Sequence, residues 1–149
     1  MSAGWNETHK WIDVHRKLYL EDGEKGHLWD STAGGGPGLI PTLLLYTTGR
    51  KSGNTFIMPL IYGEGEGGYV LIASKGGAPA HPDWYLNLQA NPEVKLKVIN
   101  DEFAGVAETV EDERREGLWK MMVEIYPPFQ DYQEKTERQI PLVLITRKA

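Results

Sequence analysis

The sequence predicts a mainly β (α+β) fold, an antiparallel barrel of six strands with a few helices packed on its outside. Strand-like segments dominate, several connections between them are of hairpin size, and few segments have a helical pattern. The chain has 149 residues, enough to bury a core as a single domain. The expected strands are 42–48, 55–62, 69–74, 94–100, 103–110 and 139–145.

Two strands carry further information. In the segment 94–100, Val94, Leu96 and Val98 alternate with two lysines, Lys95 and Lys97, which predicts a strand with one wet face. In the segment 55–62, Pro59 cannot donate a ladder hydrogen bond. We therefore expect Pro59 at a sheet edge, at a bulge or where another group meets the backbone.

Three segments have helical patterns. Apolar spacing predicts a helix over 5–20, and Pro82 is preset for the first turn of a short helix that closes before Pro92. Thr109 followed by Asp112 resembles a capping box, which predicts a helix from about Val110 to Ile125. The following Tyr-Pro-Pro should end that helix.

The first 38 residues are expected to form an N-terminal helix and a mobile glycine-rich loop, and residues 39–149 the barrel domain. The helix could simply pack on the barrel. Alternatively, its aromatic and basic residues suit a membrane surface, so residues 1–20 could attach the protein peripherally to the inner face of the cell membrane. These residues are Trp5, Lys10, Trp11, Arg16 and Lys17.

Composition excludes several classes of function. The net charge of −5 argues against nucleic-acid binding through bulk phosphate attraction, and the absence of cysteine excludes disulfides and thiolate chemistry. The four histidines lack metal-ligand spacing, so no metal site is predicted. The chain shows neither a signal peptide nor a run of about 18 apolar residues, so we expect a cytoplasmic protein.

The segment Gly63–Gly68 formally matches the G-x-G-x-x-G pattern. A dinucleotide-binding loop of that type needs a strand before it and a helix after it. Here strands are expected on both sides and two carboxylates lie inside the segment, so it is interpreted as a hairpin turn.

Two basic, glycine-bearing turns are more informative. The turn "TTGRKSGN" offers Arg50, Lys51 and Ser52, and the stretch "SKGGAPAHPDWY" offers a second set of polar and basic groups before a helix start. Such turns and helix starts bind phosphate or carboxylate, although either alone could be a solvated loop. The second set comprises Ser74, Lys75, Gly76 and Gly77, followed by Trp84 and Tyr85, which could cover a flat ring or belong to the core.

These stretches, with "NTFIMPLIY" and the late "YPPFQDYQEKTERQIPLVLI", make residues 39–145 resemble the deazaflavin-dependent nitroreductase family, a branch of the split β-barrel flavin-binding proteins. The resemblance implies a split barrel of the FMN-binding type and coenzyme F420, an 8-hydroxy-5-deazaflavin with an anionic phosphate and glutamate tail. By matching motifs, Arg50, Lys51, Ser52 and Lys75 would hold the phosphate and tail. Ser74, Gly76 and Gly77 would give polar and backbone contacts, and Pro59, Trp84 and Tyr85 would flank the ring.

The resemblance also implies a lid over the substrate, with Tyr126, Phe129 and Tyr132 as the substrate-binding positions. Tyr132, with Tyr126, is the candidate catalytic proton donor. Phe129 replaces a tyrosine of the best-known nitroreductase, so reduction of bicyclic nitroimidazoles is in doubt. Packing at the barrel rim is the alternative role for all three. Phe56 stands where relatives often have a basic residue, so tail binding could be weaker.

The predicted function is hydride transfer from reduced F420 to a hydrophobic electrophile: a quinone, an α,β-unsaturated carbonyl or a nitro compound. One alternative is an FMN-dependent reductase or oxidase on the same barrel. Another is a binding protein that sequesters a cofactor, fatty acid or haem without turnover. The sequence leaves the oligomeric state open.

Overall fold

The computed structural model describes residues 3–148, with side chains described for residues 11–148. The strands are β1 (Leu28–Asp30), β2 (Leu39–Thr48), β3 (Thr55–Ile61), β4 (Gly63–Gly65), β5 (Gly68–Ile72), β6 (Glu93–Val98), β7 (Asp101–Thr109) and β8 (Leu142–Arg147). The helices are α1 (Ala3–Glu21), α2 (Gly23–His27), α3 (Asp83–Ala90), α4 (Arg114–Ile125) and α5 (Pro128–Lys135), with short 3₁₀ turns η1 (Ser31–Gly34) and η2 (Lys75–Gly77).

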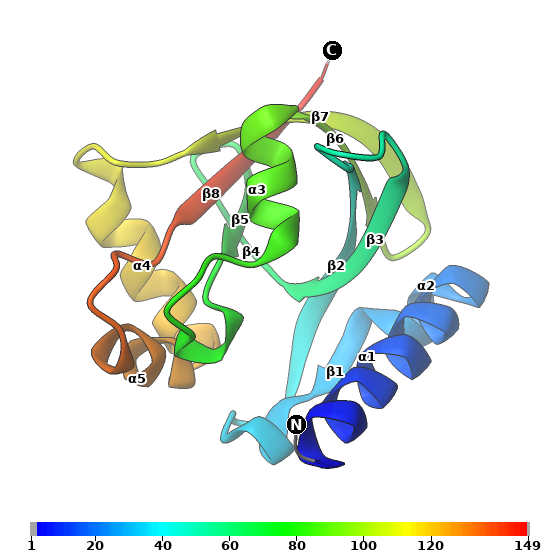
Figure 1. Cartoon of the computed structure of the whole chain (residues 1–149), viewed down its shortest axis with the longest axis horizontal. Coiled ribbons are helices and arrows are strands. Elements are labelled where there is room, and N and C mark those ends of the chain that lie inside the picture. The colour runs from blue at the N-terminus through cyan, green and yellow to red at the C-terminus, as the bar shows by residue number, and fades with distance from the viewer. Residues whose placement is uncertain (1–2, 149) are drawn as a thin grey trace.

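The strands form one curled antiparallel sheet in the order β1-β2-β6-β7-β8-β5-β4, with β3 paired to β2 off this path. Figure 1 shows the sheet wrapped into a half-barrel, with α3 across one opening and α1 on the far side of β2 from α4 and α5. Only Tyr62 separates β3 from β4, yet these strands pair with β2 and β5 respectively. The continuous chain at Tyr62 therefore joins the two sides of the split barrel.

Residues 3–148 contain eight strands, so the predicted number of six was too low. The two missed strands, β1 and β4, are three residues long and offer too few positions for a period-two pattern. All six predicted strands are present with shifted ends. The segment Gly63–Gly68 forms the β4–β5 hairpin, as predicted.

The three predicted helices are present, but the predicted N-terminal cap of one of them is wrong. Helix α4 begins at Arg114, because Thr109 is still paired to Val143 at the end of β7. The Asp112 carboxylate accepts from the Arg114 backbone amide at 3.0 Å, so the Thr109–Asp112 capping box does not form. The Tyr-Pro-Pro ends α4 at Ile125 as expected, but it also starts α5, which was missed although proline favours a first helical turn.

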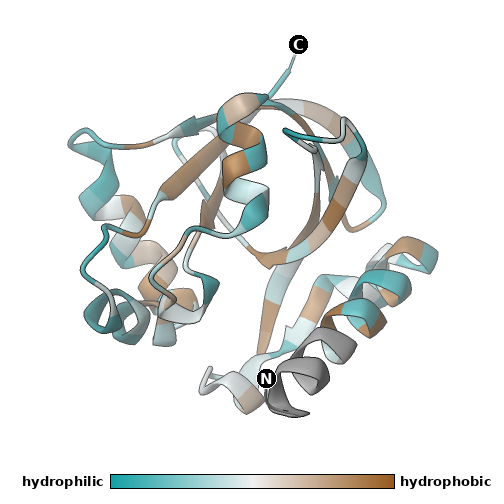
Figure 2. Cartoon of the chain, in the orientation of Figure 1, coloured by the Kyte–Doolittle hydropathy of each residue, from teal (hydrophilic) through white to brown (hydrophobic). Residues whose placement is uncertain are grey.

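Two apolar clusters lie on opposite faces of β5 and β8. Leu71 and Val143 point into the barrel, where α3 also packs, whereas Val70 and Leu144 point toward α4 and α5. Figure 2 shows both strands and the middle of α3 as predominantly hydrophobic. Because side chains alternate along a strand, a nearly continuous apolar run covers both faces.

Lys97 lies against α1 and is 8% exposed, so the prediction of a wet lysine face on β6 was half wrong. Its Nζ donates to the backbone oxygens of Tyr19 at 3.1 Å and Leu20 at 3.2 Å. These are carbonyls of the last turn of α1, where a cation is favourable. Lys95 does face solvent and pairs with Glu102 at 2.7 Å.

Helix α1 is held to the barrel by polar contacts that its periodicity does not reveal. The fully buried Tyr19 donates from its hydroxyl to the Thr42 backbone oxygen at 2.9 Å. Arg16 donates from Nε to the backbone oxygen of Ile57 on β3 at 2.7 Å, so it faces the protein rather than a membrane. Among the described residues, strand β3 pairs only with β2, so Pro59 lies at a sheet edge, one of the three places expected for it.

Candidate functional site

The first basic turn, residues 49–54, joins β2 to β3 and is closed by its own backbone. The Gly49 amide donates to the Asn54 oxygen at 2.7 Å, and the Gly53 amide donates to the Gly49 oxygen at 2.9 Å. The Ser52 hydroxyl accepts from the Asn54 amide at 3.1 Å. Ser52 therefore has a structural task in the turn, and its predicted contact with phosphate stays a prediction.

Arg50 links this turn to α3. Its Nη1 donates to the Asn87 side-chain oxygen at 2.8 Å, and its Nη2 lies 3.3 Å from the Asp83 carboxylate. The Arg50 backbone amide also donates to the Asn87 side chain, at 3.2 Å. Asn87 is buried and donates to the hydroxyl of Thr47 at 3.3 Å. The structure thus brings the first turn to the start of the helix that follows the second turn.

Asn87 was missed by sequence reasoning, although a signal was present. Asp83 and Asn87 are four residues apart, so they lie on one face of a helix. Two polar side chains on the same face of a helix that also buries aromatic residues indicate that another part of the chain supplies a hydrogen-bond donor to them. That partner is Arg50.

The second basic turn has an unusual backbone. Lys75, Gly76 and Gly77 all have positive φ, at 47°, 63° and 81°. A positive φ costs a non-glycine residue about 1–2 kcal/mol, so the conformation of Lys75 requires support from its surroundings. The Gly77 and Ala78 amides donate to the backbone oxygens of Ser74 and Lys75 at 2.9 and 3.1 Å.

The same turn packs directly on α5. A Cβ placed on Gly77 would lie 2.8 Å from the Tyr132 backbone oxygen and 3.0 Å from its Cα. Only a glycine allows this approach without displacing the helix. The predicted anion-binding turn therefore contacts the element that carries the candidate proton donor.

Helix α3 follows the second turn in the chain and contacts the first turn through Arg50. Its N-cap is Pro82, which makes no side-chain capping hydrogen bond. The first amides of a helix lack intrahelical partners, so they are free to bind an anion or water. Asp83, however, lies in this first turn with 85% of its side chain exposed, and its charge opposes an anionic ligand.

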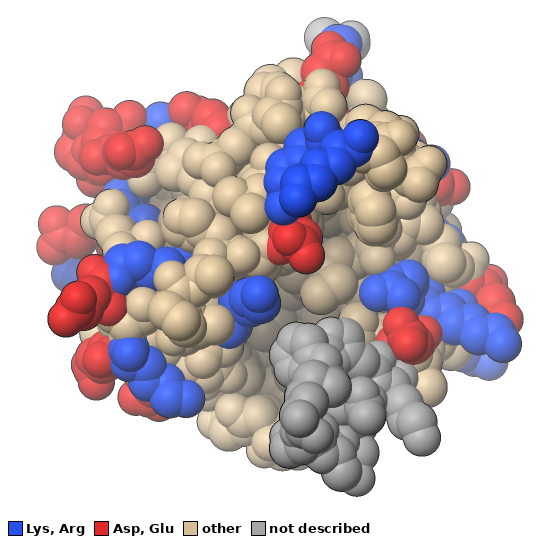
Figure 3. All heavy atoms as spheres, viewed as in Figure 1, with Lys and Arg blue, Asp and Glu red and all other residues tan. Residues whose placement is uncertain are grey.

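Lys51 and Lys75 are both exposed. Within residues 11–148, neither side chain forms an ion pair, whereas Arg50 is paired with Asp83. Figure 3 shows basic groups on the face that carries α3, with acidic groups mostly toward the rim of the view. Lys51 and Lys75 are therefore exposed cations without an ion-pair partner in residues 11–148, despite the negative net charge of the chain.

Trp84 and Tyr85 are buried in the core, which is one of the two roles that the sequence left open for them; they are 8% and 3% exposed. The Tyr85 hydroxyl lies 2.8 Å from the Thr109 hydroxyl and accepts from Gln89 at 3.1 Å. Their predicted contact with a deazaflavin ring stays a prediction.

Tyr126, Phe129 and Tyr132 form one aromatic cluster. The ring centroid of Phe129 lies 5.0 Å from that of Tyr126 and 6.4 Å from that of Tyr132, in edge-on geometry. Tyr126 and Phe129 are each 4% exposed, which agrees with packing at the barrel rim, while Tyr132 is half-buried. The Tyr126 hydroxyl donates to the Gly34 oxygen at 3.1 Å and lies 3.1 Å from the Tyr132 hydroxyl.

The glycine-rich segment is shaped around Tyr126. A Cβ on Gly34 would lie 2.4 Å from the Tyr126 hydroxyl, and a Cβ on Gly36 would lie 2.8 Å from its ring. Ser31 closes the same segment through hydrogen bonds with Gly38, including 2.7 Å from its hydroxyl to the Gly38 oxygen. The glycine-rich N-terminal segment and the 126–132 region therefore meet, and the lid over the substrate stays a prediction.

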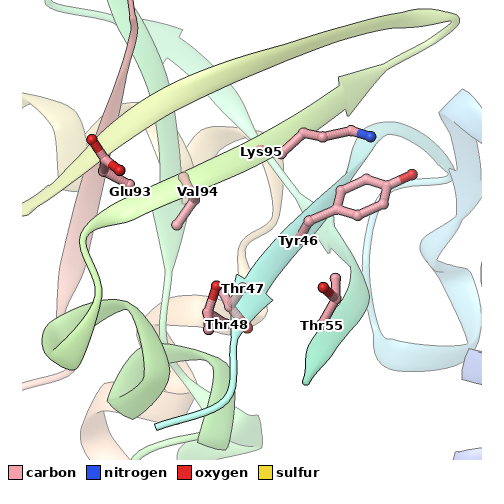
Figure 4. A pocket seen from close by; sticks show the side chains of 7 residues that line it. All are labelled: Tyr46, Thr47, Thr48, Thr55, Glu93, Val94 and Lys95. Atoms are coloured by element: carbon pink, nitrogen blue, oxygen red, sulfur yellow. The ribbon is translucent and has the colours of Figure 1, made fainter. Parts of the chain in front are cut away.

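Two cavities border this arrangement. One, of about 260 Å³, is lined by residues of β2, β3 and β6 (Figure 4), where Lys95 lies 4.5 Å above the Tyr46 ring and pairs with Glu102. Its lining residues are Tyr46, Thr47, Thr48, Thr55, Glu93, Val94 and Lys95. The other, of about 140 Å³, is bordered by His81 and Tyr85. The larger cavity contains none of the predicted site residues.

Comparison with known proteins identifies the family. The family model described as F420H2-dependent quinone reductase matches residues 18–147. The chain belongs to this family. It is 39% identical over 151 residues to an F420H2-dependent quinone reductase of Mycobacterium tuberculosis H37Rv, with 97% of each chain covered.

Solved structures agree with this family. An F420H2-dependent reductase is 44% identical, with a TM-score of 0.66 over 70% of this chain and 93% of that chain. The haem storage protein of Vibrio cholerae is 19% identical, with a TM-score of 0.56 over 72% of this chain and 82% of that chain, and shows only the shared fold. The predicted split barrel, the deazaflavin-dependent reductase activity and F420 as the cofactor are confirmed, and FMN is not needed.

Two searches of the described residues bear on other predictions. No group of three or more His, Asp or Glu side chains suited to a metal ion occurs within residues 11–148. Among the described helices, none combines the length and the apolar character needed to span a bilayer.

Proposed function

We propose that this chain reduces a quinone, with the two basic turns holding the phosphate and tail of F420 and the Tyr126–Tyr132 pair supplying the proton. The observation that carries the proposal is the packing of Gly77 on Tyr132. Through this contact, an anion-binding loop fixes the position of the helix that bears a proton-donating hydroxyl.

The residues present fit the anionic part of the cofactor. Arg50 offers a guanidinium fork, Lys51 and Lys75 offer exposed charges, and the uncapped start of α3 offers amides. When bound, F420 supplies a hydride, because carbon at ring position 5 restricts it to two-electron transfer. The chain must bind it, exclude water and deliver a proton.

The hydroxyl pair has a defined direction. The single hydrogen of the Tyr126 hydroxyl is donated to Gly34, so the 3.1 Å contact with Tyr132 must be donated by Tyr132. Burial is the main cause that raises the pKa of Tyr126, and its hydrogen bond with Tyr132 raises it further. Tyr126 therefore remains a phenol at neutral pH. Tyr132 therefore donates to a substrate only after its hydroxyl turns away from Tyr126, and water then restores the proton to the half-buried Tyr132.

A quinone matches this chemistry. A quinone that accepts a hydride needs one further proton to become a hydroquinone, and one hydroxyl can supply it. The surrounding cluster, which includes the partly buried Trp29 and Trp119, is apolar. Such a lining suits a hydrophobic acceptor, and the names of the relatives include quinone reduction.

The first experiment is a fluorescence titration with oxidised F420 and, in parallel, with 8-hydroxy-5-deazariboflavin, which lacks the phosphate and tail. We expect F420 to bind more tightly, and Arg50→Ala and Lys75→Ala each to weaken it by about 5- to 50-fold, or about 1–2.3 kcal/mol. Lys120→Ala, on exposed α4, is the matched charge control. Unchanged F420 affinity in both site variants would refute the anion-binding role of the turns.

The proton role is tested separately. Tyr132→Phe should lower kcat for quinone reduction by 10²-fold or more, the range of general acid catalysis, and leave F420 affinity unchanged. Trp119→Phe, in the same apolar cluster but without a hydroxyl to lose, is the control. Equal kcat in Tyr132→Phe and the wild type would assign the proton to water or another group.

We further propose that the protein is cytoplasmic and attaches peripherally to the inner face of the cell membrane through α1. Val14 and Leu18 are 67% and 38% exposed and lie four residues apart, which leaves apolar side chains on the exposed side of α1. Trp11 is 42% exposed but stacks on Trp29, with ring centroids 5.0 Å apart. Trp5 and Lys10 lie outside the described side chains. Deleting residues 1–20 would remove the buried Tyr19, so Val14→Glu with Leu18→Glu is the better variant. Unchanged co-sedimentation with anionic liposomes would contradict attachment.

A further inference from the structure

Arg138 lies at the centre of the loop that carries Lys75. Its Nη2 donates to the Ser74 oxygen at 2.8 Å, its Nη1 to the Ala73 oxygen at 3.4 Å, and its Nε to the Ala78 oxygen at 2.9 Å. Its Nη1 also lies 3.0 Å from Nδ1 of His81. One guanidinium thus contacts the loop both before and after its three positive-φ residues.

The partners of Arg138 are all neutral acceptors. It forms no ion pair within residues 11–148, and burial lowers the pKa of its guanidinium. An arginine placed against carbonyls rather than a carboxylate contributes through the geometry of its five donors. The Arg138 guanidinium therefore acts by orienting peptide groups of the loop.

The orientation of those peptide groups has a consequence on the other side of the loop. Peptide bonds in residues 3–148 are trans, so each carbonyl points opposite to the N–H of the same peptide unit. Arg138 draws the oxygens of Ala73 and Ser74 toward itself, which turns the N–H groups of Ser74 and Lys75 away from it. Among the described residues neither N–H has a backbone partner, whereas the Gly77 and Ala78 amides further along the loop are paired.

We propose that Arg138 is a positioning residue for cofactor binding: it holds the Ser74 and Lys75 amides, with the Lys75 side chain, in the orientation that binds the phosphate and tail of F420. This inference rests on the proposed function of the two basic turns. Arg138 itself lies on the opposite side of these peptide units from the amides it orients. Its effect is therefore exerted through the loop backbone.

The test compares Arg138→Lys and Arg138→Met with the wild type. Lysine keeps the charge but has one donor group in place of the fork, so it cannot reach all four acceptors. Each variant is titrated with F420 and with 8-hydroxy-5-deazariboflavin, and hydrogen exchange is followed at the Gly77 and Ala78 amides. Arg114→Met is the matched control, because Arg114 is also partly exposed but pairs with two carboxylates, Glu108 on β7 and Asp112 just before α4.

We expect both Arg138 variants to lose at least 10-fold in F420 affinity and less than 2-fold in deazariboflavin affinity, with faster exchange at Gly77 and Ala78. Retained deazariboflavin binding shows that each variant is folded. Wild-type F420 affinity and exchange in Arg138→Lys would overturn the inference and leave the proposed function intact. If the wild type bound F420 no more tightly than deazariboflavin, the proposed function of the two turns would fail. The proposed role of Arg138 in binding would then fail as well. A loss of both affinities together would indicate a merely structural role for Arg138 and would also overturn the inference.

Discussion

The substitution Gly77→Ala tests the contact between the loop and α5, and Gly76→Ala is its internal control. Both residues have positive φ, at 81° and 63°. A Cβ on Gly76 meets nothing within 4 Å, whereas a Cβ on Gly77 meets the Tyr132 backbone at 2.8 Å. The two variants therefore share a conformational cost and differ in one steric contact.

The magnitudes follow from these two terms. The left-handed conformation costs alanine about 1–2 kcal/mol, offset by about 0.4–1 kcal/mol from the lower entropy of the unfolded chain. Gly76→Ala should thus cost about 1 kcal/mol. Gly77→Ala adds an overpacking cost of about 1–3 kcal/mol, because the obstructing atoms belong to backbone and cannot rotate away.

Thermal unfolding should separate the two variants. For a chain of this size about 1 kcal/mol corresponds to roughly 2–4 °C, so Gly76→Ala should lower Tm by roughly 2–4 °C and Gly77→Ala by roughly 5–15 °C. Gly77→Ala should also raise the KM for F420, because the loop must move off α5. Equal Tm values would show that the loop does not pack on Tyr132 as described.

Two further predictions concern stability. Lys97→Met should lower the free energy of unfolding in urea by about 1–2 kcal/mol, because it removes two charge-assisted hydrogen bonds to the end of α1. Lys95→Met, on the exposed face of β6, should change it by less than about 0.5 kcal/mol. Similar values for the two variants would contradict the capping role of Lys97. Burial lowers the pKa of His27 and of His81, with Arg138 adding to the latter shift. The unfolded chain therefore binds more protons, and stability should fall as pH drops below about 6.5, where an unperturbed histidine begins to protonate. Replacing both histidines with glutamine should flatten this slope between pH 7.5 and 5.5, and an unchanged slope would assign it to other groups.

The fold was predictable where side-chain pattern decides the structure. The six longer strands, helices α1 and α3 and the Gly63–Gly68 hairpin follow from apolar runs, proline and glycine, which act locally. Lys97 was misjudged because the carbonyls it binds lie 77 and 78 residues away in sequence. No local pattern distinguishes such a lysine from a solvated one.

The site was predictable in its residues but not in its connections. Motif matching selected Arg50, Lys75 and Tyr132, since these types suit an anion and a proton donor. The contacts that place them come from Asn87 and Arg138, which carry no motif of their own. Their roles depend on partners that the fold brings together over 37 to 65 residues.

Substitution of Asp83 tests whether a carboxylate beside Arg50 weakens the binding of an anionic ligand. Its carboxylate lies 3.3 Å from Nη2 of Arg50 and in the first turn of α3, so it occupies the two cationic features that an anionic ligand needs. Asp83→Asn should therefore raise F420 affinity by about 2- to 5-fold at low salt, with a smaller gain at high salt and none for deazariboflavin. Asn87→Ala should do the opposite, because Arg50 loses its acceptor at 2.8 Å and becomes less ordered. A loss of F420 affinity in Asp83→Asn would mean instead that the carboxylate holds Arg50 in its binding position, and that the ion pair persists when the cofactor binds.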